Sequence, residues 1–158
     1  MRGSYLALAV GAIAGIAALL AWWSWSETPR SSRLRPGVDL SPDSACDLRA
    51  APCVSVVPSG GTIAFGIQPR AIPLIEPLAL SVVLAGIDAT TVGVDIVGIG
   101  MNMGANHKRL KSFGEGRYSG VTSLPVCIRR AMEWEARVTV SNGVKSRTIA
   151  RYRFITTH

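Results

Sequence analysis

Sulfur- and nitrogen-bearing side chains gather in the second half of this 158-residue chain. Met101 and Met103 are two positions apart, His107 follows, and Cys127 and Met132 come farther along. Thioether, imidazole and thiol groups are soft or borderline ligands, which favour Cu(I) over hard cations. If the two neighbouring methionines end a strand, they project to one side, and the histidine can fold back over them. The set predicts a candidate Cu(I) site.

The same residues also have an ordinary structural interpretation. Methionines fill cores at strand edges, a loop histidine is usually solvated, and an unpaired cysteine usually behaves as a small buried hydrophobe. Glycines at positions 98, 100 and 104 would then permit a bulge or a tight crossing. The spacing does not repeat as it does in strong metal motifs. A copper site and simple packing are therefore both open alternatives.

Other chemistries have less support in the sequence. The chain has two histidines, His107 and His158, and no nucleophile elbow, so nothing would orient Cys127 and His107 as nucleophile and base. Glu133 and Glu135 stand two apart on an expected strand, where we expect a solvated face. The glycines around position 100 do not precede a helix, which argues against a phosphate cradle. The sequence predicts that the chain is not an enzyme.

The cysteine spacing bears on the compartment. Cys46 and Cys53 are seven residues apart and close a short loop if they are oxidised. Such a disulfide favours an exported domain and pins its start. The alternative is a reduced, buried pair.

Period-two patterns indicate the elements that hold these residues. Apolar residues alternate with polar or small ones in four runs, and strict alternation is typical of half-buried strands. In the last run Asn-Gly follows at positions 142–143, the strongest short hairpin signal, and a further strand is expected toward Phe154. The pattern predicts an all-β fold, a β-sandwich of about seven strands over residues 45–158. The alternating residues are Ile63, Phe65 and Ile67; Leu78, Leu80, Val82 and Leu84; Val92, Val94 and Ile96; and Met132, Trp134, Ala136, Val138 and Val140.

The first 26 residues predict a single N-terminal transmembrane helix. Residues 3–26 carry no charge, and residues 5–25 are long enough to contact membrane lipid across a hydrocarbon core. Trp22, Trp23 and Trp25 mark where the helix leaves the lipid. A cleaved secretory signal is the alternative. Residues 27–44 are rich in Pro, Ser and Gly, which indicates a linker.

Basic residues are concentrated in the C-terminal part of the chain. Residues 1–107 hold 6 basic and 7 acidic side chains, whereas residues 108–158 hold 11 and 3. This excess favours binding to anionic lipid or to an acidic partner. No motif that recognises DNA or RNA accompanies it, so we expect that the chain does not bind nucleic acid. Basic residues flank both sides of the predicted anchor, so orientation rests on the cysteine pair.

Several of these features occur together in a known class. An N-terminal anchor and a short Cys loop precede Gly98-Ile-Gly-Met-Asn-Met-Gly104, Leu124-Pro-Val-Cys127 and Met132-Glu-Trp134. Over about residues 45–156 the chain resembles the FixH-like and YtkA-like membrane-anchored domains of proteobacteria. The resemblance implies an immunoglobulin-like antiparallel β-sandwich in the periplasm, held by one span in the inner (cytoplasmic) membrane. It also implies copper handling or respiratory oxidase assembly, with a membrane protein complex or copper protein as partner. The implied ligands are Met101, Met103, His107, Cys127 and Met132; a histidine–methionine pair typical of copper chaperones is absent.

Two functions follow as expectations. The first is a non-catalytic, membrane-anchored accessory protein that presents Cu(I) or assists oxidase assembly. The rival is a structural interaction domain that docks through its basic C-terminal half without metal.

Overall fold

Ten strands are present in the part of the chain that the computed structural model describes, which is residues 37–41, 46–104, 106–126, 130–143 and 146–157. The sequence predicts about seven strands, and seven of the ten have four or more residues. The other three, β1, β6 and β7, have two or three residues, too few for a period-two pattern to show. The strands are β1 (Val38–Leu40), β2 (Cys53–Val56), β3 (Thr62–Gln68), β4 (Leu78–Ala85), β5 (Thr91–Gly98), β6 (His107–Arg109), β7 (Lys111–Ser112), β8 (Arg117–Thr122), β9 (Ala131–Asn142) and β10 (Ser146–Thr157).

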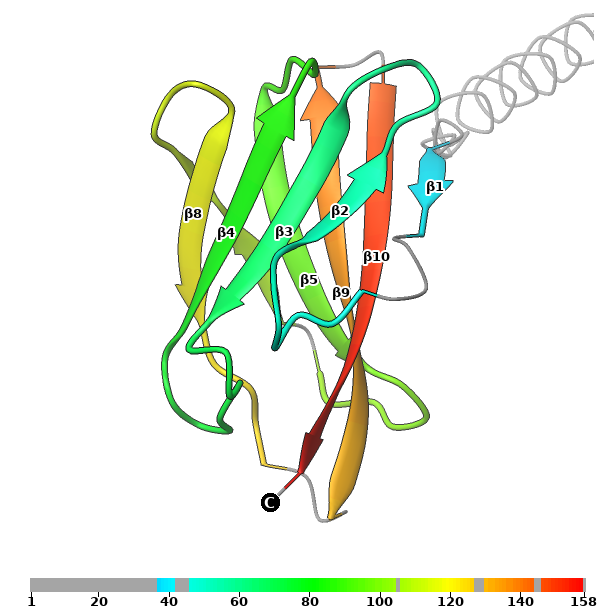
Figure 1. The fold of residues 1–158 in the computed structure, drawn as a ribbon. Coiled ribbons are helices and arrows are strands. Elements are labelled where there is room, and N and C mark those ends of the chain that lie inside the picture. Colours follow the sequence, from blue (N-terminus) through cyan, green and yellow to red (C-terminus); the bar gives the residue numbers. More distant parts are fainter. Residues whose placement is uncertain (1–36, 42–45, 105, 127–129, 144–145, 158) are drawn as a thin grey trace, which may run out of the picture. The chain divides into compact units, whose positions relative to one another are not determined.

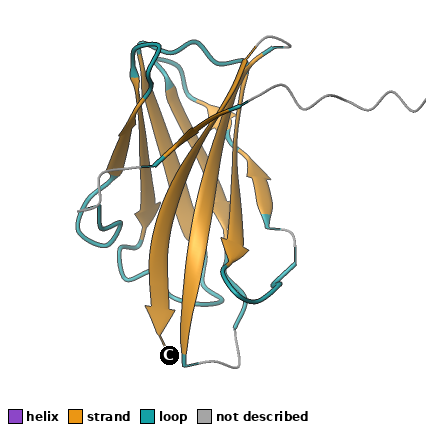
Figure 2. Cartoon of the chain, turned by 90° about the vertical axis from the view of Figure 1, so that its right-hand side faces the viewer, coloured by secondary structure: helices purple, strands orange, loops and turns teal. Residues whose placement is uncertain are grey.

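The strands form two five-stranded sheets, so the predicted all-β class is confirmed. Sheet A has the order β1-β10-β9-β5-β6, and sheet B has the order β2-β3-β4-β8-β7. All pairings are antiparallel except that of β1 with β10. Figure 1 shows sheet B in front of sheet A, and Figure 2 shows strands and loops, with no helix, in the described residues.

The inner faces of both sheets share one core. The alternating apolar residues expected from the sequence are all buried there. The rings of Phe65 on β3 and Tyr152 on β10 lie 5.2 Å apart between centroids, and the Tyr152 hydroxyl donates a hydrogen bond of 3.0 Å to the carbonyl of Ile63. Trp134 Nε1 donates to Thr156 Oγ1 at 2.9 Å within sheet A. Buried polar atoms are therefore paired where large aromatic side chains fill the core.

The β9–β10 hairpin is the longest pairing among the strands that the structure describes. It runs in register from Asn142 opposite Ser146 to Ala131 opposite Thr157. Gly143 adopts a φ of +57°, which an Asn-Gly turn provides at little cost. The hairpin predicted from positions 132–154 is confirmed.

Strand β1 lies inside the segment that the sequence indicates as a linker, residues 27–44. Val38 pairs with Thr148 and Leu40 with Ala150, in parallel. An ion pair of 3.2 Å joins Asp39 to Arg151, 112 residues away, and a contact so distant in sequence has no local signal. The linker interpretation therefore needs revision at residues 38–40.

The predicted anchor, residues 1–26, lies outside the described residues. In the part that the structure covers, no helix has the length and apolarity to cross a bilayer.

Candidate functional site

The side chains of two predicted soft ligands, Met103 and Met132, lie beside Gly98 at the end of β5, and Met101 reaches the same place with its backbone carbonyl. Met132 is buried in the core, and Met101 and Met103 are partly buried against it. A Cβ atom on Gly98 would overlap Met132 Cε and would lie 3.0 Å from Met103 Cγ and 2.8 Å from the Met101 carbonyl oxygen. Gly98 thus leaves the space that the Met103 and Met132 thioether side chains share.

His107 lies on the other side of the same sheet. It begins β6 and pairs with Asp95 of β5, and its ring covers Gly93, where a Cβ atom would lie 3.0 Å from His107 Cε1. Gly93 and Gly98 are five positions apart on one strand, so they face opposite sides. The structure therefore separates His107 from Met103 and Met132, and the expected folding of the histidine over the methionines is not found.

The remaining predicted ligand, Cys127, lies outside the described residues. Among the described residues, no group of three or more His, Cys, Asp and Glu side chains is placed to hold a metal ion. Thioether groups and Cys127 are not among these side chains. Copper binding therefore stays a prediction, now centred on Met103 and Met132.

The predicted disulfide is present. Cys46 and Cys53 are joined, with their Cα atoms 5.5 Å apart. Cys53 is buried at the start of β2, so the bond ties the preceding loop to the edge of sheet B. It fixes the start of the domain, as the seven-residue spacing indicates.

A cluster of charges on the outer face of sheet A was missed by sequence reasoning. The side chain of Glu135 is only 7% exposed, although we expected it to be solvated. Its carboxylate contacts Arg137 Nε at 2.7 Å, Arg151 Nη1 at 3.0 Å and Arg153 Nε at 3.4 Å. Glu133, two residues earlier, is 45% exposed and reaches only Arg153, at 3.7 Å. The expectation of a solvated pair is wrong for Glu135 and agrees with the exposure of Glu133.

The arginines hold Glu135 in its ionised form. Burial raises the pKa of a carboxyl group, but hydrogen bonds and charge from Arg137 and Arg151 outweigh it, and the pKa of Glu135 is lowered. The pKa of Arg151 is raised: its own burial opposes the shift, but Glu135 and Asp39 overcome it. The carboxylate of Glu135 is thus fully paired with arginine side chains. Such an ion-pair cluster is typical of a structural role.

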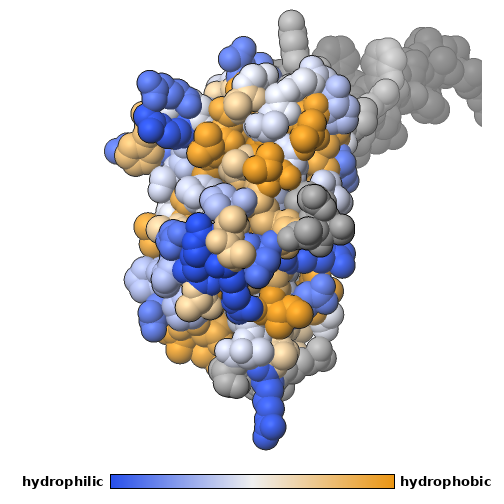
Figure 3. Space-filling view, in the orientation of Figure 1, coloured by the Kyte–Doolittle hydropathy of each residue, from blue (hydrophilic) through white to orange (hydrophobic). Residues whose placement is uncertain are grey.

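The outer face of sheet B carries exposed apolar side chains, unlike the charged outer face of sheet A. Exposed apolar side chains lie on β2, β4 and β8, namely Val54, Val56, Val83 and Val121. Figure 3 shows apolar residues over the upper half of this face and hydrophilic ones at the upper left, where the β7–β8 turn lies.

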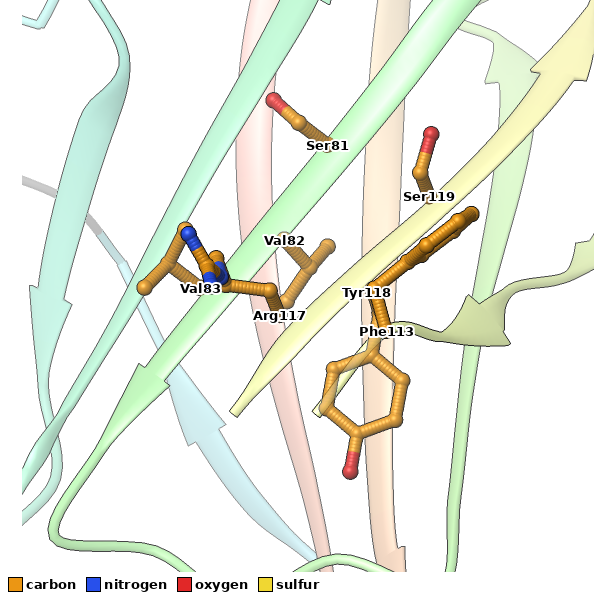
Figure 4. A pocket seen from close by; sticks show the side chains of 7 residues that line it. All are labelled: Ser81, Val82, Val83, Phe113, Arg117, Tyr118 and Ser119. Carbon is orange, nitrogen blue, oxygen red and sulfur yellow. The ribbon is translucent and has the colours of Figure 1, made fainter. Parts of the chain in front are cut away.

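A hollow of about 610 Å³ lies beside that turn. It is open to solvent, and its lining combines hydroxyl, apolar and aromatic groups with one guanidinium, as Figure 4 shows. Among the described residues, no carboxylate or imidazole lines it. The lining residues are Ser81, Val82, Val83, Phe113, Arg117, Tyr118 and Ser119.

Comparison with protein-family models, curated proteins and solved structures gave no match. The class of protein that the structure defines is therefore an all-β domain of two packed sheets with one short-loop disulfide. The resemblance to FixH-like and YtkA-like domains stays a prediction.

Proposed function

We propose that this chain is a non-catalytic accessory protein, anchored in the inner (cytoplasmic) membrane with an immunoglobulin-like domain in the periplasm. The strand order supports the fold assignment. Strands β3-β4-β8-β7 correspond to the A-B-E-D sheet of an immunoglobulin domain, and β10-β9-β5-β6 correspond to G-F-C-C′. Strands β1 and β2 are additions at the free edges of β10 and β3.

The observation that carries the proposal is the Cys46–Cys53 disulfide. Structural disulfides persist in oxidising compartments and are rare in the cytosol. Together with the uncharged residues 3–26 and the tryptophans near the end of that segment, it favours a domain across the membrane from the cytoplasm.

The experiment is protease protection in a Gram-negative host. We expect the domain to resist protease in intact cells and to be digested in spheroplasts, with a fragment of the anchor remaining in the membrane. Mass spectrometry of the mature N-terminus then separates a retained anchor from a cleaved signal. Protection of the domain in spheroplasts would place it in the cytoplasm and contradict the proposal.

A second candidate function is Cu(I) handling, which one observation favours. Met103 and Met132 approach each other at Gly98, and thioethers select Cu(I). The full chain is titrated with Cu(I) against bicinchoninate, beside the double variant Met103→Leu, Met132→Leu, with His107→Ala as the matched control. Leucine keeps volume and apolarity, so the double variant should fold.

We expect the double variant to lose at least tenfold in affinity, about 1.4 kcal/mol, and the His107 variant to bind normally. A separate Cys127→Ser variant reports whether the thiol contributes. Equal, weak binding by every protein would remove copper from the proposal and favour the metal-free interaction domain. If copper does bind, loss of oxidase activity in a deletion strain would support the oxidase-assembly role that the resemblance implies.

A further inference from the structure

Several turns share one end of the domain with the start of β1. Val38, Gly60, Gly86 and Asn142 line a single hollow there, so the β2–β3, β4–β5 and β9–β10 turns lie beside the first residue of β1. The β7–β8 turn is at the same end, because the Leu84 N–H near the end of β4 donates to the Gly116 carbonyl at 2.8 Å. We call this the β1 end (Figure 1).

The tip of the β7–β8 turn exposes an aromatic ring. Phe113 is 63% exposed, and its N–H donates to the Arg117 carbonyl at 2.8 Å, which closes the turn. Lys111 Nζ lies 5.9 Å from the centre of the Phe113 ring, and Arg117 forms an ion pair with Glu115. An exposed aromatic ring beside cations is typical of segments that lie in a membrane interface.

Basic side chains without ion pairs lie on β6 and β7, the two short edge strands that precede this tip. Lys108, Arg109 and Lys111 are exposed on β6 and β7, and none of them forms an ion pair with another described residue. In contrast, Arg137, Arg151 and Arg153 on β9 and β10 pair with Glu133, Glu135 and Asp39, whereas Arg147 at the start of β10 is in no ion pair with another described residue. Part of the basic excess of the C-terminal sequence therefore lies uncompensated at the β6–β7 edge, next to Phe113.

The chain length before β1 limits how far the β1 end can be from the bilayer. If residues 3–26 span the membrane, residues 27–36 are the tether to Gly37. Ten residues reach about 35 Å when fully extended, and a flexible coil of that length averages about 18 Å. The covalent connection therefore keeps the β1 end within reach of the headgroups.

We propose that the β7–β8 turn docks on anionic phospholipid headgroups of the membrane that holds the anchor. Phe113 enters the interface, and Lys108, Arg109 and Lys111 attract the negative surface. This inference rests on the proposed membrane anchoring. An exposed ring beside basic side chains without ion pairs fits an anionic lipid surface. Each basic residue near an anionic leaflet raises the bound population about fivefold.

The test uses the full chain in lipid nanodiscs with a photoreactive residue. Phe113→p-benzoylphenylalanine places the probe at the tip. Ile75→p-benzoylphenylalanine is the matched control, because Ile75 is 70% exposed and lies at the opposite end, where its N–H donates to the Leu124 carbonyl. Both variants are irradiated in discs of phosphatidylcholine with and without phosphatidylglycerol, and lipid adducts are counted by mass spectrometry.

We expect lipid adducts at position 113 to exceed those at position 75 about tenfold in anionic discs. Neutral discs, the Lys108→Ala, Lys111→Ala double variant, or a rise in salt from about 0.1 M to about 1 M should each lower the yield several-fold. Equal adduct yields at the two positions would overturn the inference. So would an adduct yield at position 113 that is the same in neutral and anionic discs. A chain that fails to stay in the discs would contradict the anchor itself. A chain that stays but gives no adduct at 113 would contradict only the docking and leave an acidic protein as the occupant.

Discussion

Replacing Glu135 tests whether the charge cluster on sheet A stabilises the fold. In Glu135→Gln the side chain keeps its size and one acceptor oxygen but loses its charge. Arg151 and Arg153 then keep their ion pairs with Asp39 and Glu133. Arg137 loses its contact with Glu135, the one ion pair that it forms among the described residues.

The magnitude follows from the contacts and their exposure. A hydrogen bond to a charged group contributes about 1.5–3 kcal/mol, and Glu135 accepts such bonds from more than one arginine. The arginine side chains are 33–66% exposed, so solvent screens part of this stabilisation. We expect the free energy of unfolding to fall by about 2 kcal/mol at pH 7. For a domain of this size that lowers Tm by about 8 °C.

The pH dependence has a definite sign. The pKa of Glu135 is lowered in the folded protein, whereas a glutamate in the unfolded chain titrates near pH about 4.3. Its ionised form therefore stabilises the fold fully above that pH, and the stabilisation is lost as the pH falls through the lower folded pKa. The difference between wild type and Glu135→Gln should stay constant from about pH 7 to about pH 5 and narrow below about pH 4.

Thermal unfolding of the full chain in detergent, followed by the β-sheet circular dichroism signal, measures this difference. Glu133→Gln is the matched control, since Glu133 lies on the same face and strand but is exposed and has one long contact. Its Tm should change by no more than about 2 °C. Equal shifts for the two variants, or a wild-type advantage over Glu135→Gln that persists undiminished at pH 3, would refute the reasoning.

Three further changes test other parts of the structure. Cys46→Ser should lower the free energy of unfolding by about 2 kcal/mol in urea, and reductant should destabilise only the wild type. In the same assay, Tyr152→Phe should lower the free energy of unfolding by about 1 kcal/mol. Tyr118→Phe should lower it less, because Tyr118 is half-buried and its hydrogen bond is longer. The reverse order would contradict the description of the core. Gly116→Ala should lower Tm more than Gly114→Ala. Both glycines have a positive φ, but only a Cβ atom at position 116 would overlap backbone atoms. Equal decreases in Tm on thermal unfolding would contradict this geometry.

The sequence predicts best what depends on neighbours along the chain. The alternation at Ile63, Phe65 and Ile67, and again from Met132 to Val140, requires only that one face of each strand be buried. The Asn-Gly pair locates the final hairpin, and the cysteine spacing indicates the disulfide. These features are local, so composition and period are sufficient.

Features that depend on register between distant strands escape such reasoning. Glu135 is buried because β10 places Arg151 and Arg153, which are 16 and 18 residues away, beside it. His107 parts from the methionines because β6 pairs with β5 opposite Asp95, which puts its ring on the outer face. The spacing of Glu135, His107 and the methionines in the sequence does not show which strands pair, or which side chains lie on the same face of the sheet.

The two proposed binding regions lie at opposite ends of the domain. Gly98, where Met103 and Met132 meet, is the last residue of β5, whereas Thr91 begins β5 at the β1 end, the end at which the β7–β8 turn lies. Eight strand residues span roughly 25 Å, and effects of changes more than about 10 Å apart usually add. Copper binding and lipid docking would therefore be independent properties of one domain. A docked β1 end would also turn the methionine end away from the bilayer, where a partner complex could reach it.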